Sequence, residues 1–107
     1  MTLTRDFKET VETRIKTDQE FAKALLDEAV YLFLNGEPET ARLILREIVN
    51  ATVGFEELAQ ATSKPSKSLH RMLSVKGNPT MDNLTSILNV LRKNLNVNIK
   101  VHSVSCV

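Results

Sequence analysis

Residues 55–73 read FEELAQATSKPSKSLHRML, and this stretch decides the fold. Its apolar residues are Leu58 and Ala59 in the first half and Leu69, Met72 and Leu73 in the second half. The second set has the i, i+3, i+4 spacing that places side chains on one face of a helix. Pro65 lies between the halves, and its fixed φ suits the first turn of a helix. The stretch therefore predicts two short helices joined by a tight turn.

The second of these helices has an outer face that carries no acidic side chain. Its outward residues are Ser66, Lys67, Ser68, His70 and Arg71, and the flanking turns carry Lys64, Lys76 and Asn78. Lys67 and Arg71 are four residues apart, so they share one helix face. Arg71 has the donors to bind O6 and N7 of a guanine. We expect the first five residues to face DNA bases and the other three to contact phosphates, as in a helix-turn-helix.

The distribution of charge supports this interpretation, although the net charge is only +1. Residues 1–57 hold 12 acidic and 7 basic side chains, whereas residues 58–107 hold 7 basic side chains and one acid, Asp82. The two halves therefore carry −5 and +6, and no carboxylate occurs from Leu58 through Met81. A basic half of this kind indicates a face presented to phosphate. The alternative is two ordinary solvated helix surfaces.

The same stretch resembles the helix-turn-helix of lambda-repressor-like domains. The residues that carry the resemblance are Leu58, Ala59, Ser63, Leu69 and Met72. In those domains the small alanine permits close helix crossing, and the position of Ser63 is usually a glycine because the turn has positive φ. Phe55 stands where many of them carry a phosphate-binding glutamine. Serine and phenylalanine are thus two departures from the family pattern.

Over residues 7–97 the chain resembles the addiction-module antidote proteins, which are helix-turn-helix antitoxins of the HigA type. The most specific segments are NATVGFEELA at 50–59, KPSKSLHRML at 64–73 and GNPTMDNL at 77–84. The resemblance implies an antitoxin that represses its own operon and binds a RelE/HigB-like toxin encoded beside it. We expect the toxin contact on the acidic N-terminal half or on the predicted strand at residues 96–104, because a basic RNA-cleaving toxin could use either the acidic charge or the unpaired strand.

The remaining periodicities predict further helices around the motif. We expect one helix from Thr4 to Lys16, a second capped by Asp18 and ended by a left-handed Gly36, a third started by Pro38, and a last one capped by Thr80. Their predicted inner residues are Phe7, Val11 and Ile15; Phe21, Leu25, Leu26, Ala29, Leu32 and Phe33; Leu43, Ile44, Ile48 and Val49; and Leu84, Ile87, Leu88, Leu91 and Leu95. Gly54 separates the third helix from the motif.

From residue 96 to residue 104 the apolar period changes to two. Val97, Ile99 and Val101 alternate with polar residues, which predicts a β-strand. A lone strand needs a partner for its backbone groups, either the same strand of a second copy or a strand of another protein. The alternative is a frayed tail.

The predicted fold class is all-α, a lambda-repressor-like helix-turn-helix domain with extra N-terminal helices and a C-terminal β-strand. We expect one domain over 1–107, divided into an N-terminal helical extension (1–36), a helix-turn-helix core (38–95) and the strand (96–104). Since one motif makes few contacts, we expect a homodimer on a palindromic operator with half-sites about 34 Å apart.

Other classes of function lack support in the sequence. Ser66 and His70 have no orienting acid, and no CxxC, HExxH or glycine-rich phosphate loop occurs, so we expect no enzyme, metal or cofactor. No apolar run reaches the ~20 residues of a membrane span, and charges interrupt the start of the chain, so no signal peptide is predicted. The single Cys106 fits a reducing cytoplasm. The alternatives are a plain helix-turn-helix regulator without a toxin and a protein-interaction module that does not bind DNA.

Overall fold

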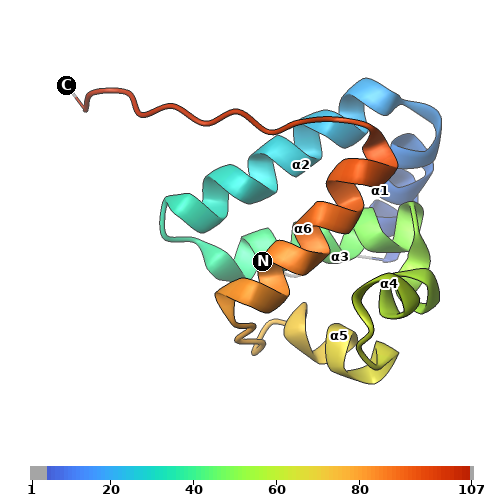
Figure 1. The fold of residues 1–107 in the computed structure, drawn as a ribbon. Helices are drawn as coiled ribbons and strands as arrows, with labels where there is room; N and C mark the ends of the chain where they lie inside the picture. The colour runs from blue at the N-terminus through green and yellow to red at the C-terminus, as the bar shows by residue number, and fades with distance from the viewer. Residues whose placement is uncertain (1–4, 107) are drawn as a thin grey trace.

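The computed structural model describes residues 5–106 of the chain, and side chains from residue 9 onward. Six helices lie in this range: α1 (Arg5–Thr17), α2 (Gln19–Leu34), α3 (Pro38–Ala51), α4 (Gly54–Thr62), α5 (Ser66–Met72) and α6 (Met81–Leu95). No strand forms among residues 5–106. Figure 1 shows α2 and α6 at the front of the bundle, α5 at its lower edge and the C-terminal segment at its upper edge. The predicted all-α class is confirmed.

The helix boundaries follow local signals that the sequence contains. The side chain of Asp18 accepts from the backbone N–H of Phe21 at 3.2 Å and so caps α2. Thr80 accepts from the N–H of Asn83 at 3.1 Å and caps α6 in the same way. Gly36 has φ +85°, as predicted for the end of α2. These boundaries were predictable because each depends on residues within one turn.

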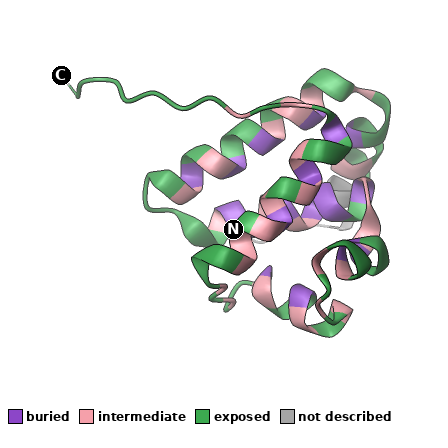
Figure 2. Cartoon of the chain, in the orientation of Figure 1, coloured by how far each residue is buried: buried purple, intermediate pink, exposed green. Residues whose placement is uncertain are grey.

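One continuous cluster of buried side chains joins all six helices. Its members run from Ile15 in α1 and Leu26 in α2, through Ile48 in α3, to Leu58, Leu69 and Leu91 in α4, α5 and α6. Figure 2 shows buried positions, coloured purple, along the sides of the helices that face one another. The N-terminal helices α1 and α2 therefore share their core with α4, α5 and α6, and α3, which packs on α1, α2 and α4, connects the two groups.

Two details of the predicted core differ from the structure. In α3 the fully buried residues include Ala41 and Leu45, whereas the predicted inner residues Leu43 and Ile44 are half-buried. The buried surface of α3 is broader than the predicted stripe because α3 packs against three helices, α1, α2 and α4. In α1, Val11 and Ile15 pack on the core as predicted. The side chain of Phe7 and the predicted helix start at Thr4 lie outside the described residues.

The predicted C-terminal β-strand is wrong for the chain as it stands. Residues 97–106 form no ladder, and only the start of the segment is held. Arg92 donates to the carbonyl of Val97 at 3.3 Å and to Oδ1 of Asn98 at 3.0 Å, while Val97 and Ile99 are half-buried. Beyond Ile99 every described residue is exposed (Figure 2). A strand needs backbone partners, and none of the described segments supplies them.

None of the described helices has the length and hydropathy needed to cross a bilayer.

Candidate nucleic-acid interface

The turn between α4 and α5 is fixed by backbone geometry. Ser63 has φ +56° and ψ +38°, the left-handed conformation that the turn was predicted to require. The backbone N–H groups of Ser63 and Lys64 both donate to the carbonyl of Ala59, and the hydroxyl of Thr62 donates to the carbonyl of Leu58 at 2.8 Å. The last turn of α4 therefore has its polar groups satisfied, and the chain reverses sharply into α5.

The inner face of α5 is held in the core. Leu69 and Leu73 are fully buried, and Met72 is half-buried against the same cluster. Leu58 is fully buried on α4, which packs against α3, α5 and α6. Because the apolar side of α5 is fixed in this way, its opposite side has a defined direction toward solvent.

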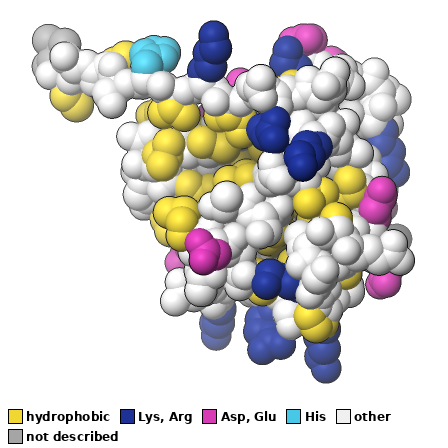
Figure 3. Space-filling model, in the orientation of Figure 1, with side chains coloured by type: hydrophobic (Ala, Val, Ile, Leu, Met, Phe, Trp, Pro, Cys, Tyr) yellow, Lys and Arg dark blue, Asp and Glu magenta, His cyan; other side chains and the backbone are white. Residues whose placement is uncertain are grey.

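That solvent side carries the residues predicted to face DNA bases. Lys67, His70 and Arg71 are exposed, whereas Ser66 and Ser68 are half-buried. Figure 3 shows Lys and Arg side chains projecting from the lower edge of the molecule, where Figure 1 places α5. The structure therefore groups the predicted basic residues on one helix surface, with the two serines set back from it.

His70 has an additional role within the motif. Its ring stacks on the ring of Phe55 with centroids 3.7 Å apart and planes at 17°. Phe55 is itself buried at the start of α4, so the contact joins the first turn of α4 to the outer side of α5. Phe55 therefore supplies an aromatic ring that supports the outer side of α5.

The three predicted phosphate contacts flank α5. Lys64 is half-buried in the turn before it, and Lys76 and Asn78 are exposed in the loop after it. This loop turns tightly at Gly77, whose N–H donates to the carbonyl of Ser74 at 3.0 Å. A Cβ on Gly77 would lie 2.6 Å from the carbonyl oxygen of Arg71 and still closer to that of Met72. Glycine is required there because the loop folds back onto the end of α5.

Sequence reasoning missed Arg42, which lies on α3 and reaches this same loop. Its Nε donates to the carbonyl of Ser74 at 3.0 Å, and its Nη2 donates to the carbonyl of Val75 at 2.8 Å. Arg42 is only 7% exposed. Arg42 lies 32 residues before Ser74, so no local pattern in the sequence marks this contact.

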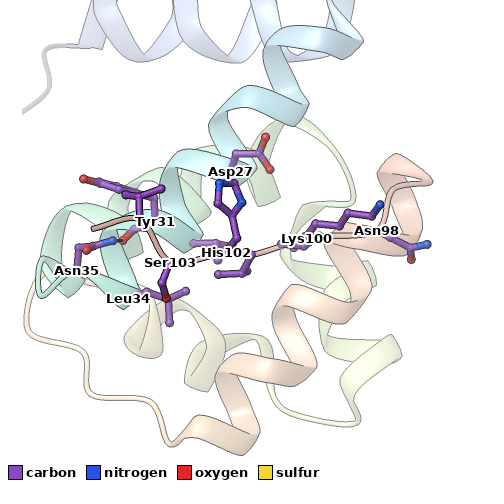
Figure 4. A pocket seen from close by; sticks show the side chains of 12 residues that line it. Asp27, Tyr31, Leu34, Asn35, Asn98, Lys100, His102 and Ser103 are labelled. Carbon is purple, nitrogen blue, oxygen red and sulfur yellow. Dashed lines mark hydrogen bonds between the residues drawn. The ribbon is translucent and has the colours of Figure 1, made fainter. Parts of the chain in front are cut away.

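A second surface lies between α2 and the C-terminal segment. A groove of about 720 Å³ separates them, and its apolar lining comprises Val30, Tyr31, Leu34, Ile99, Val101 and Val104. Tyr31 and Leu34 are 58% and 62% exposed. Figure 4 shows Lys100 and His102 on the segment and Asp27 on α2 around this groove. In Figure 1 the segment leaves the body at the edge opposite α5.

Among the described residues, no group of three or more His, Cys, Asp or Glu side chains is placed to hold a metal ion. No family model, curated protein or solved structure matches the chain. The family resemblances of the sequence therefore stay predictions.

Proposed function

We propose that this protein is a sequence-specific DNA-binding repressor with a lambda-repressor-like domain, and that it acts as the antitoxin of a type II toxin–antitoxin module. In this proposal α5 is the recognition helix, with Lys67 and Arg71 reading base edges. Lys64, Lys76 and Asn78 contact phosphates on either side. The toxin is a RelE/HigB-like protein encoded beside it, and the pair represses its own operon.

The observation that carries the DNA-binding proposal is the geometry of α4 and α5. A left-handed Ser63 turns the chain between them, Leu69 and Leu73 anchor the inner side of α5, and Lys67 and Arg71 remain exposed on the outer side. A docked helix with an exposed basic side, preceded by a bracing helix, is the arrangement that a major groove accepts.

The salt dependence of DNA affinity tests this proposal. The probe is the DNA upstream of the gene, titrated by fluorescence anisotropy between about 50 and 200 mM salt. If Lys64 and Lys76 of two copies each neutralise one phosphate, four phosphates are neutralised and the slope of log K against log salt reaches about −3.6. An interaction module that does not bind DNA has no affinity at any of these salt concentrations, and that result contradicts the proposal.

The antitoxin part of the proposal rests on the family resemblance and on the second surface. The groove between α2 and the C-terminal segment offers exposed Tyr31 and Leu34 for a protein partner. Because this surface and α5 lie at opposite edges of the molecule (Figure 1), toxin and DNA can be bound together. We place the toxin contact here.

Paired variants separate the two partners. The double substitution Tyr31→Asp, Leu34→Asp is expected to abolish protection against the toxin in a co-expression growth assay, and DNA affinity should stay unchanged. Lys67→Ala, Arg71→Ala should show the reverse pattern. If the first pair leaves protection intact, the toxin binds elsewhere; if no neighbouring reading frame is toxic, the plain regulator remains.

The proposed homodimer must place two α5 helices on one side of the DNA. The C-terminal segment lies at the edge of the molecule opposite α5 (Figure 1). A twofold contact through this segment would therefore point the α5 helices of the two copies away from each other, unless the segment bends. This geometry favours the toxin over a second copy as the partner of the segment. Analytical ultracentrifugation of a chain ending at Ile99 tests it, since the dimer should persist without the segment.

A further inference from the structure

Arg42 connects α3 to the loop that follows the recognition helix. Its guanidinium donates one hydrogen bond to each of two consecutive loop carbonyls, those of Ser74 and Val75, at 3.0 and 2.8 Å. A planar guanidinium suits two neighbouring acceptors, and these donors carry a charge, which strengthens both bonds. Since Arg42 is 7% exposed, solvent competes weakly for these donors.

The loop is also attached to the end of α5. The N–H and the hydroxyl of Ser74 both donate to the carbonyl of Arg71, at 3.2 and 2.7 Å. Gly77 closes the turn with its bond to Ser74 and lies too near the carbonyls of Arg71 and Met72 to accept a side chain. The backbone of residues 74–77 is therefore fixed from two sides, by α3 and by α5.

Lys76 lies inside this fixed turn, between Val75 and Gly77, and Asn78 follows directly. Both side chains are exposed, although the backbone that carries them is held in place. We propose that Arg42 is a positioning residue for DNA binding, which acts by holding the loop so that Lys76 and Asn78 reach phosphates beside α5. This inference rests on the proposed function, because it assigns those phosphates to operator DNA.

Arg42 also brings a positive charge to this side of the molecule, and geometry and charge make different predictions. If charge alone matters, Arg42→Lys preserves DNA affinity. If geometry matters, Arg42→Lys weakens binding, because a lysine ammonium lacks the planar fork that holds two carbonyls at once. Arg42→Met keeps the length of the apolar stem and removes every donor.

The experiment compares the salt slope of binding to the upstream DNA for four proteins and one double variant. Arg42→Met is expected to lose affinity about tenfold at low salt, with a slope shallower by about 1 for each DNA-bound copy, as for removal of one phosphate contact. Lys76→Ala should give the same change in slope. The double variant Arg42→Met, Lys76→Ala should change the slope no further, because both substitutions remove the same contact. Arg42→Lys should fall between wild type and Arg42→Met.

Leu45→Ala is the matched control, since Leu45 is fully buried on the same helix and does not contact the loop through any hydrogen bond. Loss of folded protein lowers apparent affinity similarly at every salt concentration, so a merely structural role leaves the slope unchanged. If Arg42→Met does not fold, the salt slope of Arg42→Lys decides whether Arg42 positions the loop.

Three results overturn the inference. The first is an unchanged slope in the arginine variants, the second is wild-type affinity in Arg42→Lys, and the third is full additivity with Lys76→Ala. In each of these cases wild type still binds DNA, so the proposed function survives. Absence of DNA binding by wild type is a different outcome, because it removes the proposed function together with this inference.

Discussion

The α4–α5 unit and the C-terminal segment lie at opposite edges of the molecule and are held in opposite ways. In α4 and α5 the backbone hydrogen bonds form within each helix, and the N–H groups of the turn donate to the carbonyl of Ala59. Leu58 and Leu69 are fully buried. In the segment, only Val97 and Ile99 are partly covered, and the residues beyond them are exposed. The apolar side chains of the first region are covered by the shared core, whereas the second region presents apolar side chains without cover.

Under the proposed function, this difference separates two kinds of binding surface. A rigid helix that displays fixed donors suits DNA, whose groove has a fixed shape, because little ordering entropy is lost on binding. In the proposed toxin complex, exposed apolar side chains of the segment such as Val101 and Val104 become buried. We therefore expect changes on the buried side of the α4–α5 unit to act on folding, changes on its exposed side to act on DNA binding, and changes in the segment to act on a protein partner.

The largest expected loss of stability comes from a substitution on the fully buried side of α5. Leu69→Ala should lower the free energy of unfolding by about 2–5 kcal/mol, because it leaves a cavity where α4 and α5 meet. Urea denaturation measures this change. Met81→Ala is the control, since Met81 is 72% exposed and its loss should cost no more than about 0.5 kcal/mol. Equal costs for the two variants would show that α5 is not docked.

A smaller loss is expected at Gly77 in the loop after α5. Gly77→Ala forces a Cβ against the carbonyls of Arg71 and Met72 and should cost about 1–3 kcal/mol of stability, as overpacking does. Asn78→Ala changes the neighbouring exposed residue and should be nearly neutral. Thermal unfolding of both variants checks the prediction, and a neutral Gly77→Ala would mean that the loop does not fold back onto α5.

A substitution at Ser63 is expected to increase stability. Ser63→Gly relieves the left-handed strain at φ +56° and should raise the free energy of unfolding by up to about 1 kcal/mol, reduced by the greater entropy of glycine in the unfolded chain. Ser103→Gly, in the exposed segment, should change nothing measurable. A destabilising Ser63→Gly, measured by urea denaturation, would place the turn in another conformation.

The smallest effect on stability is expected from the segment itself. Val101→Ser, Val104→Ser should alter the free energy of unfolding by no more than about 0.5 kcal/mol, since both side chains are exposed. The same variant should weaken toxin binding, measured by isothermal titration calorimetry. A loss of stability above about 1 kcal/mol in the free protein would show that the segment packs on its own chain.

The sequence predicts what is decided locally. Asp18 and Thr80 cap helices because their acceptors serve N–H groups three residues away. The left-handed conformation of Ser63 is implied by the resemblance to lambda-repressor-like domains and not by a local pattern, since serine rarely adopts positive φ. The basic outer side of α5 follows from the spacing of Lys67 and Arg71 once Leu69 and Leu73 are known to face inward.

The features that sequence reasoning missed are decided by distant residues. The burial of Arg42 depends on two carbonyls that lie more than 30 residues later in the chain. Glu47 is also buried, and no residue pattern near it distinguishes it from a glutamate on the surface. The strand prediction failed for the same reason. Alternation at Val97, Ile99 and Val101 fits a strand, but pairing needs a second segment, and the described chain contains none.

The most direct test of the central claim is a gel shift on the DNA upstream of the gene, with excess unrelated competitor DNA. It compares wild type with Lys67→Ala, Arg71→Ala and with Lys93→Ala, Lys100→Ala, which removes the same charge from exposed positions outside the α4–α5 unit. We predict that wild type and the second variant shift the DNA and that the first does not. Equal loss in both variants, or no preference of wild type for this DNA, would contradict the assignment of α5 as the recognition helix.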